Sequence, residues 1–279
     1  MSLLRAARVR ALDMVRRGRE VAWCPEWMNL GNLLYIGVWA LEGESRGSPR
    51  RILLQPSKAA SLAVFPELRR RFFVERSEVR FTDRRVMPWS GREEHEPDRY
   101  DDPLLVPYIE QVLLPGSPLN SAPEDLDDDA MVVNVRRGDY FSVPEHRAAF
   151  GIDTVAYTLE AVRASVDAHG APSSIVVVSD DTAWCREYLR ALDDVAPVRV
   201  REGSATDDLA ALVHAPRLIL PNSTFSYWGG YIGDVIHPER EVVAPWFFDR
   251  TARGGKAGQL RPSWHRIDEI PGGWGEPAA

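Results

Sequence analysis

The sequence predicts an α/β protein whose second half is built on a parallel β-sheet. Between residues 131 and 245, short apolar segments alternate with segments that have the apolar spacing of helices. The apolar segments are continuous, as in strands that are covered by helices on both faces. A polar, proline-bearing stretch over residues 115–130 precedes them. We expect this stretch to link two halves of the chain.

The first half contains fewer clear elements. Residues 3–19 have apolar side chains at roughly helical spacing and predict an amphipathic helix. A strand is expected at residues 21–24, and after a glycine-containing turn a helix is expected at residues 33–45. Together they form the opening of an α/β unit. A second strand is expected at residues 52–55, and the polar, proline-bearing residues 84–103 predict a loop.

In the second half, each predicted strand is followed by a predicted helix. The strands are expected at residues 131–135, 174–179, 198–201, 217–221 and 241–245, and the last of these closes the sheet. The helices are expected at residues 153–169, 182–192, 207–215 and 226–236. Asp153 or Thr154 is the expected N-cap of the first helix, and Asp207 is expected to start the third.

Composition places the chain of 279 residues among ordinary globular proteins and argues against several functions. A net charge of −7 argues against a general nucleic-acid-binding protein. The first third is basic, however, so an acidic substrate or peripheral membrane contact stays open. No apolar run approaches the ~18 residues that span a bilayer, and no secretory signal is recognised. We therefore expect a cytoplasmic protein, and its oligomeric state is left open.

Two adjacent arginines, Arg136 and Arg137, follow the strand predicted at residues 131–135. Ligands of open parallel sheets bind beyond the carboxyl ends of the strands, and guanidinium groups match phosphate oxygens. Gly138 allows a sharp turn there, and Asp139 can orient one of the arginines. Spacing alone leaves the alternative of an ordinary Arg–Asp surface pair equally open.

A second polar turn follows the strand predicted at residues 217–221 and leads into a helix. It contains Asn222, Ser223, Thr224, Phe225 and Ser226. Free N–H groups at a helix N-terminus bind anions, and the hydroxyl groups add donors. Simple N-capping by the Ser/Thr cluster is the alternative. Two anion-suited turns in one sheet favour a diphosphate ligand.

Three acidic runs have different interpretations. Asp207 and Asp208 open a predicted helix, where they complement its dipole, or a carboxylate there accepts two hydrogen bonds from a guanine edge. Asp180 and its neighbour follow the strand at residues 174–179, and we interpret them mainly as capping residues. The run at residues 127–129 has an Asp-x-Asp spacing, but no strand precedes it, so we predict no metal site.

Together these segments resemble glycosyltransferase family 11, the bacterial α-1,2-fucosyltransferases. The family's His-x-Arg-Arg-x-Asp strand end matches Asn134–Asp139 except at its first position. Its Ser-Asp-Asp strand end resembles Ser179–Asp181, and its Asn-Ser-Ser-Phe-Ser-Trp-Trp segment resembles Asn222–Trp228. Its Gly-x-Gly-Asn-Gln opening is similar to Asn29–Leu33, and its closing strand resembles Val243–Phe247. The resemblance runs in order over roughly residues 22–270.

The resemblance implies a GT-B-like fold with two Rossmann-like halves facing a cleft. Residues 1–122 would form an acceptor-side domain, and residues 123–279 a nucleotide-sugar-binding domain. The implied reaction is an inverting, metal-independent transfer of fucose to a hydroxyl of a carbohydrate or glycosylated small-molecule acceptor. GDP-fucose would be a co-substrate, with no resident cofactor. The implied nucleotide-sugar contacts are Asn32, Asn134, Arg136, Arg137, Asp180, Asp208, Asn222, Ser223, Thr224, Phe225 and Ser226.

An inverting displacement needs charge stabilisation and benefits from a general base. Arg136 and Arg137 are the candidate catalytic cations for the departing diphosphate. The candidate bases are Asp139, Glu145 and His146, and we expect the last two on a mobile loop.

Two other functions stay open. Asn134 replaces the family's histidine and Leu33 its glutamine, which allows a related transferase that uses another GDP-hexose or a dTDP-deoxysugar. Such an enzyme would serve natural-product or cell-surface glycan assembly. A non-catalytic nucleotide or sugar binder is the second alternative, although retention of both arginines argues against it.

Overall fold

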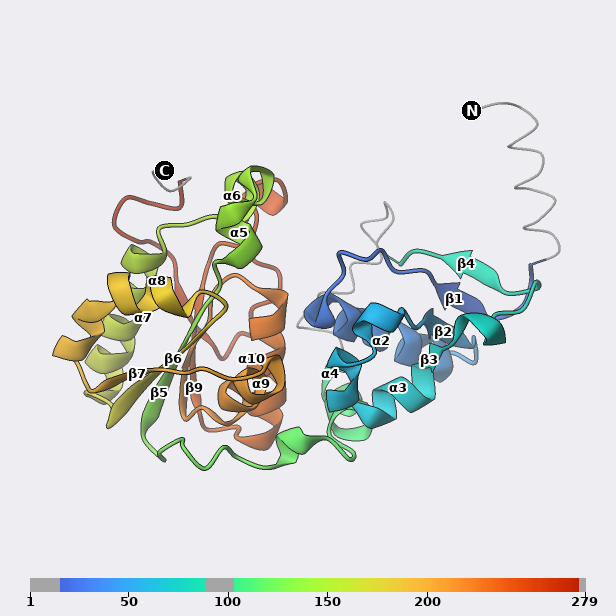
Figure 1. The fold of residues 1–279 in the computed structure, drawn as a ribbon, viewed down its shortest axis with the longest axis horizontal. Helices are drawn as coiled ribbons and strands as arrows, with labels where there is room; N and C mark the ends of the chain where they lie inside the picture. The colour runs from blue at the N-terminus through green and yellow to red at the C-terminus, as the bar shows by residue number, and fades with distance from the viewer. Residues whose placement is uncertain (1–15, 89–102, 276–279) are drawn as a thin grey trace. The chain divides into compact units, whose positions relative to one another are not determined.

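The computed structural model describes residues 16–88 and 103–275 and divides into two compact units, residues 1–117 and 118–279 (Figure 1). The expected domain boundary was placed between residues 122 and 123. Both units contain a parallel sheet covered by helices. The α/β, GT-B-like fold class is therefore confirmed, whereas the cleft between the halves stays a prediction. The helix expected at residues 3–19 falls mainly outside the described residues, and residues 16–19 are not helical.

In the described part of unit 1, four strands form a sheet in the order β3-β2-β1-β4, and every pairing is parallel. The strands are β1 (Glu20–Ala22), β2 (Arg50–Leu53), β3 (Phe73–Val74) and β4 (Arg84–Val86). The longer helical segments are α2 (Leu30–Ser45), α3 (Pro66–Phe72), α4 (Leu105–Tyr108) and a π-helical continuation of α4, Ile109–Leu113. Single 3₁₀ turns cover Pro56–Lys58, Ser61–Val64 and Arg76–Glu78.

Helix α2 is apolar on nearly all sides because it lies inside unit 1. It connects β1 to β2, and it ends before Gly47, whose φ of 68° suits glycine. Both predicted central strands of unit 1 and the helix between them are thus confirmed, with ends displaced by at most three residues.

In the described part of unit 2, six strands form a sheet in the order β10-β9-β8-β5-β6-β7, again with parallel pairings throughout. The strands are β5 (Ala130–Val135), β6 (Ser174–Ser179), β7 (Val198–Val200), β8 (Arg217–Ile219), β9 (Glu241–Pro245) and β10 (His265–Ile267). The helices are α5 (Gly138–Ser142), α6 (Pro144–Phe150), α7 (Thr154–His169), α8 (Thr182–Tyr188), α9 (Ala205–His214) and α10 (Thr224–Ile236).

The order of these strands locates a switch point in the sheet. The chain builds outward from β5 through β6 to β7, and then returns to add β8, β9 and β10 on the other side of β5. The direction of winding therefore reverses between β5 and β8. In doubly wound sheets, a crevice opens at this place beyond the carboxyl ends of the strands. Helices α5 and α6 lie at that edge (Figure 1).

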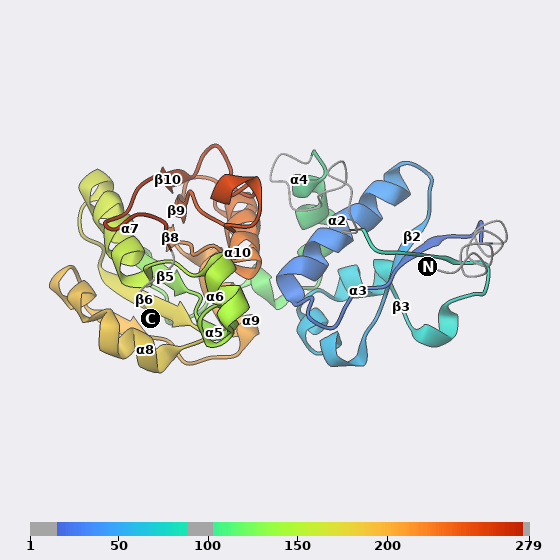
Figure 2. The same cartoon turned by 90° about the horizontal axis from the view of Figure 1, so that it is seen from above.

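The core of unit 2 explains why its strands read as continuous apolar runs. All six residues of β5 are buried. Alternate residues such as Met131, Val133 and Ile175 pack with α7 and α8. Helices α9 and α10 pack together on the other side of the sheet (Figure 2). Strands with both faces covered need apolar side chains at every position.

Several sequence-based expectations need correction. Residues 84–86 lie in the expected loop but form the edge strand β4, and residues 89–102 of that stretch lie outside the described residues. Strand β10 extends the sheet beyond the strand expected to close it. Both are short edge strands with mostly exposed side chains, so they carry no apolar pattern. The helix expected at residues 182–192 ends at Tyr188, and a 3₁₀ segment, Arg190–Asp194, follows.

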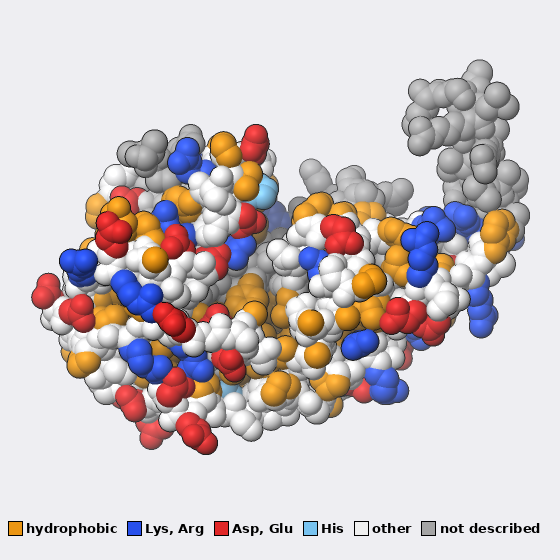
Figure 3. Space-filling view, in the orientation of Figure 1, with side chains coloured by type: hydrophobic (Ala, Val, Ile, Leu, Met, Phe, Trp, Pro, Cys, Tyr) orange, Lys and Arg blue, Asp and Glu red, His pale blue; other side chains and the backbone are white. Residues whose placement is uncertain are grey.

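The described helices and surface add two observations. None of the helices in residues 16–88 and 103–275 is long and apolar enough to span a membrane. On the face drawn in Figure 3, acidic and basic side chains of unit 2 are interspersed. A nucleic-acid-binding surface would instead gather basic side chains on one face.

Candidate active site

Polar segments follow three neighbouring strands of unit 2 where each strand ends. Arg136 follows β5, Asp180 follows β6, and Asn222 lies just beyond β8. Because β5 lies between β6 and β8 in a parallel sheet, these segments share one edge. That edge contains the switch point and is the expected position of a ligand.

Arg136 is held between two carboxylates. Its guanidinium lies 2.5 Å from Asp139 Oδ1 and 2.7 Å from Asp180 Oδ2. The other oxygen of Asp139 lies 3.5 Å from His146 Nδ1. A Cβ atom at Gly138 would lie 2.4 Å from Asp180 Oδ2, so any larger residue here would displace this carboxylate. The predicted Arg–Asp pair forms, and Asp180 has a larger part in the site than its interpretation as a cap implied.

Arg137 is more enclosed than Arg136. Its guanidinium carbon lies 3.9 Å from the ring centre of Phe141 and 3.9 Å from that of Trp184. Its Nε is buried without a hydrogen bond, and Asp181 Oδ2 lies 3.5 Å away. Burial lowers the pKa of Arg137, partly offset by Asp181, but arginine stays charged at neutral pH. A buried, charged N–H group that lacks a hydrogen bond can donate one to an oxygen of a bound ligand.

The aromatic stack on Arg137 was missed by motif reasoning. Neither Phe141 nor Trp184 was assigned a role from the sequence. The available signal was spacing, because Phe141 lies four residues after Arg137 and Trp184 three residues after Asp181, the N-cap of α8. Rings on both faces of a guanidinium restrict its rotation and leave its N–H edge open to oxygen ligands.

Asn134 and Ser226 connect the sheet to helix α10. Ser226 Oγ donates to Asn134 Oδ1, and Asn134 Nδ2 donates to the carbonyl of Val178 at 2.9 Å. Both side chains are buried. The arrangement gives them a scaffold role beneath the site, and their contact with a nucleotide sugar stays a prediction.

In the turn between β8 and α10, the side chain of Asn222 is fixed by hydrogen bonds, whereas the first turn of α10 has no side-chain cap. Asn222 is buried, and its Nδ2 donates to the carbonyls of Phe150 and Phe248, each at 2.9 Å. Ser223 occupies the N-cap position but makes no side-chain hydrogen bond to the first turn. Thr224 and Phe225 are half-buried. Capping by the Ser/Thr cluster, the alternative to anion binding, is therefore not observed at Ser223.

The two acidic residues at the start of α9 have separate environments. Ser204 is the N-cap of this helix, and it forms a capping box with Asp207, so the helix begins before Asp207. Asp208 is half-buried, and its carboxylate has no hydrogen bond or ion pair among the described residues. Burial raises the pKa of Asp208 to about 6; attraction to Arg201 opposes this shift, and repulsion from Asp207 adds to it. The helix-capping explanation thus fits Asp207 and does not fit Asp208.

The candidate bases lie on short helices. Glu145 and His146 are exposed on α6, so the expected loop is wrong at this point. Pro at the first position of α6 favours helix over loop. Stacking of Tyr140 on Phe150 at 4.7 Å joins α5 to the end of α6. His146 lies beside Asp139, whereas no contact of the Glu145 carboxylate is found among the described residues.

Asn32 and the acidic run at residues 127–129 belong to other elements. Asn32 lies on α2 of unit 1 and is half-buried. Asp127 accepts a hydrogen bond from Ser174 at 3.2 Å, and Asp129 pairs with Arg217 at 2.6 Å. Within the described ranges, no group of three or more His, Cys, Asp or Glu side chains is arranged to hold a metal ion.

The sequence is similar to those of known glycosyltransferases. An α-1,2-colitosyltransferase of Escherichia coli is 29% identical over 126 residues, which are 43% of this chain and 41% of that protein. A galactoside α-(1,2)-fucosyltransferase 1 of Ateles belzebuth is 35% identical over 109 residues, which are 38% of this chain and 30% of that protein. The matched stretches thus span less than half the length of these relatives.

The chain is also similar to a solved structure and to a family model. A crystal structure of POFUT1 in complex with GDP aligns with a TM-score of 0.44 and 15% identity, over 81% of this chain and 98% of that chain. The model of glycosyl transferase family 11 matches residues 122–243. This range contains both arginines and the turn before α10. Residues 122–243, which make up most of unit 2, are therefore similar to glycosyl transferase family 11.

Proposed function

We propose that this protein is an inverting, metal-independent glycosyltransferase that moves fucose from GDP-fucose to a hydroxyl of a saccharide. The observation that carries the proposal is the pair Arg136 and Arg137 at the switch point of a sheet in the stretch that is similar to family 11. The similarity to a protein named galactoside α-(1,2)-fucosyltransferase makes galactosides the first acceptors to test.

The two arginines suit the charge that develops during transfer. Breaking the bond between sugar and phosphate leaves negative charge on the diphosphate and positive charge on the sugar. Arg137 is already oriented by its aromatic stack, so little rearrangement is needed when the charge appears. Arg136 is held by Asp139 and Asp180, which keep it at the strand end until the diphosphate binds.

His146 is the general base that the geometry favours. Its Nδ1 lies 3.5 Å from Asp139 Oδ2, which favours the tautomer that has its proton on Nδ1. In that tautomer, Nε2 has the lone pair that accepts the proton of the acceptor hydroxyl. Asp139 is already committed to Arg136, and Glu145 has no oriented partner. The hydroxyl oxygen attacks the anomeric carbon opposite the departing diphosphate, which inverts that centre.

Asp208 is the proposed reader of guanine. An ionised carboxylate accepts two hydrogen bonds from the N1–H and amino group of guanine, and thymine and uracil lack this paired edge. Its burial and missing partner suit such a role. Because the pKa of Asp208 is about 6, the ionised form that accepts both bonds is lost below that pH.

Thermal stabilisation by a panel of GDP, UDP, dTDP and ADP tests the donor assignment, because binding to the folded state raises its melting temperature. We expect GDP to give the largest shift, and we expect fucose transfer with inversion when GDP-fucose and a β-galactoside are added. A larger shift with dTDP would contradict the assignment.

Transfer of another sugar is the second candidate function. The similarity to a protein named α-1,2-colitosyltransferase favours this candidate. The reaction would be of the same kind, and only the transferred sugar would differ from fucose. Competition between GDP-fucose and other GDP-sugars in one assay separates the two candidates.

A further inference from the structure

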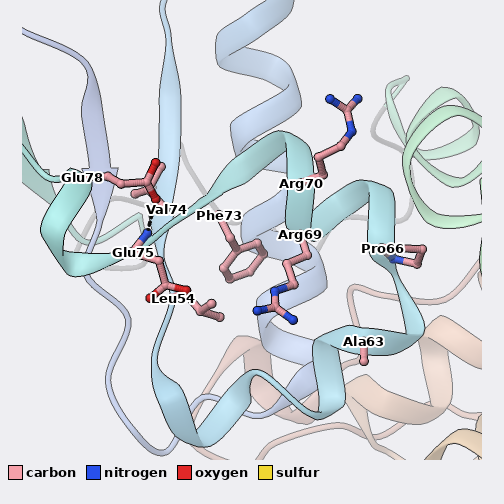
Figure 4. Close-up of a pocket in the computed structure, with 9 residues that line it drawn as sticks. All are labelled: Leu54, Ala63, Pro66, Arg69, Arg70, Phe73, Val74, Glu75 and Glu78. Atoms are coloured by element: carbon pink, nitrogen blue, oxygen red, sulfur yellow. Dashed lines mark hydrogen bonds between the residues drawn. The ribbon is translucent and has the colours of Figure 1, made fainter.

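Unit 1 contains a cavity of about 530 Å³ in a part of the chain that the family match does not cover (Figure 4). It lies between helix α3, the segment after β2 and the end of β3. Its apolar lining includes Leu54, Pro66 and Phe73, and its charged lining includes Arg69, Glu75 and Glu78. A volume of this size accommodates a small organic ligand.

In this cavity, Arg69 lies on the side opposite Glu75 and Glu78. Figure 4 shows Arg69 directed from α3 toward the side that bears Leu54 and Glu75, whereas Arg70 points away. The guanidinium of Arg69 has no hydrogen bond or ion pair among the described residues. Arg70 and Arg71 are by contrast paired with Glu67 and Glu44. Arg69 and Arg70 both line the cavity, and Arg69 is the one whose guanidinium has no partner among the described residues.

The two carboxylates on the opposite wall are fixed by the backbone. Glu75 and Glu78 form a capping box, in which each side chain accepts a hydrogen bond from the backbone N–H of the other. A carboxylate offers about four acceptor positions, so each retains several for a ligand. The capping box thus holds two hydrogen-bond acceptors across the cavity from one charged donor.

This combination selects a class of ligand. A phosphate group would face two carboxylates, and a cationic ligand would face Arg69. Sugar hydroxyls both donate and accept, so one neutral saccharide can satisfy the carboxylates and the guanidinium together. The apolar floor at Leu54, Pro66 and Phe73 suits the C–H faces of a sugar ring.

We propose that this cavity of unit 1 binds the neutral saccharide that accepts the transferred sugar. The proposal rests on the proposed transferase function for the role of the saccharide, and on the cavity alone for its binding. Arg69 donates to ring or hydroxyl oxygens, and Glu75 accepts from hydroxyl groups on the opposite side. The donor's phosphates bind elsewhere, at the enclosed arginines of unit 2.

Saturation-transfer NMR on the full chain loaded with GDP tests binding without catalysis. The probes are lactose, maltose and chitobiose, and the variants are Arg69→Ala and Glu75→Gln. We expect at least one disaccharide to bind wild type, and each variant to weaken that binding by roughly tenfold or more through loss of charge-assisted hydrogen bonds. Arg71→Ala is the matched control, because Arg71 is on the same helix but pairs with Glu44 outside the cavity.

Kinetics with the disaccharide that binds give a second measurement. In both cavity variants, we expect a raised KM for the saccharide, with unchanged GDP affinity and unchanged hydrolysis of GDP-fucose by water. Saccharide binding that depends on Arg69, without any fucose transfer, would reject the transferase proposal and keep the binding site. Equal saccharide binding by wild type and both cavity variants, or no binding by any of the three probes, would overturn the site.

Discussion

The two units have similar sheets and different chemistry. In unit 2, the arginines after β5 are enclosed by aromatic rings and by carboxylates from a neighbouring strand end. In unit 1, the cavity beside β3 has the exposed, unpaired Arg69 opposite two carboxylates that accept hydrogen bonds from backbone N–H groups. Enclosed cations suit phosphate charge, whereas separated donors and acceptors suit hydroxyl groups. A shared architecture thus leaves function to the segments that follow the strands.

The largest effect is expected from the enclosed cations. Arg136→Ala and Arg137→Ala should each reduce fucose transfer ~10²–10³-fold, because each removes charge stabilisation of about 3–4 kcal/mol in the transition state. Steady-state kinetics with GDP-fucose measure this loss, and circular dichroism checks folding. Arg186→Ala is the control, since Arg186 is exposed and pairs with Glu202. Turnover near that of wild type in both variants would rule out the phosphate role.

Asp208 gives the next effect, with opposite signs for binding and stability. Asp208→Asn should weaken GDP binding by roughly 10–100-fold, through loss of hydrogen bonds worth about 1.5–3 kcal/mol. Titration calorimetry with GDP and dTDP measures this loss. Wild-type affinity for GDP should also fall as the pH drops below about 6.

The stability of the same variant should rise at neutral pH. The raised pKa means that folded Asp208 keeps its proton at a pH where the unfolded chain has lost it, so ionisation destabilises the fold as the pH rises from about 4 to 6. Asp208→Asn removes this cost. Because the carboxylate is partly exposed and screened by solvent, we expect a gain of only about 1 kcal/mol at pH 7, which disappears near pH 4. Denaturant unfolding at both pH values checks it, and a loss of stability would indicate a capping role.

The aromatic stack should have a smaller effect. Trp184→Leu frees one face of Arg137, and we expect about a tenfold loss of transfer activity from a cation–π contribution of about 1–2 kcal/mol. The matched control is Tyr188→Leu, because Tyr188 stacks on Trp184 and does not contact Arg137. Equal losses in both variants would point to packing of α8 instead of orientation of the guanidinium.

Chelation is expected to have the smallest effect. Treatment with EDTA should leave fucose transfer unchanged, because the proposed mechanism assigns the diphosphate charge to arginines. Loss of transfer that Mn²⁺ or Mg²⁺ restores would instead require metal ligands, and the run at residues 127–129 would be reconsidered.

The sequence was most informative where strands are buried. Strands β6 and β9 lie at the positions that continuous apolar runs indicated, and Asp153 caps α7 as expected, accepting a hydrogen bond from Ala156 N at 2.9 Å. Edge strands β4 and β10 were missed because mostly exposed side chains leave no such run. The candidate site was located by a similar rule, since polar residues directly follow buried strands. The local sequence pattern thus indicates which strands are buried and where they end, but it does not indicate which distant side chains will be in contact.

By itself, the sequence determined an α/β chain with arginines and a Ser/Thr turn at strand ends, because side-chain periodicity and turn chemistry are local properties. Tertiary structure decided which carboxylate each arginine meets. Strand order sets Asp180 beside Arg136 and Trp184 over Arg137, although more than 40 residues separate the members of each pair. It also decided that Asp208 is half-buried while Asp207 caps its helix. Desolvation and pairing depend on neighbours that are distant in the chain, and so only the folded arrangement distinguishes two adjacent aspartates.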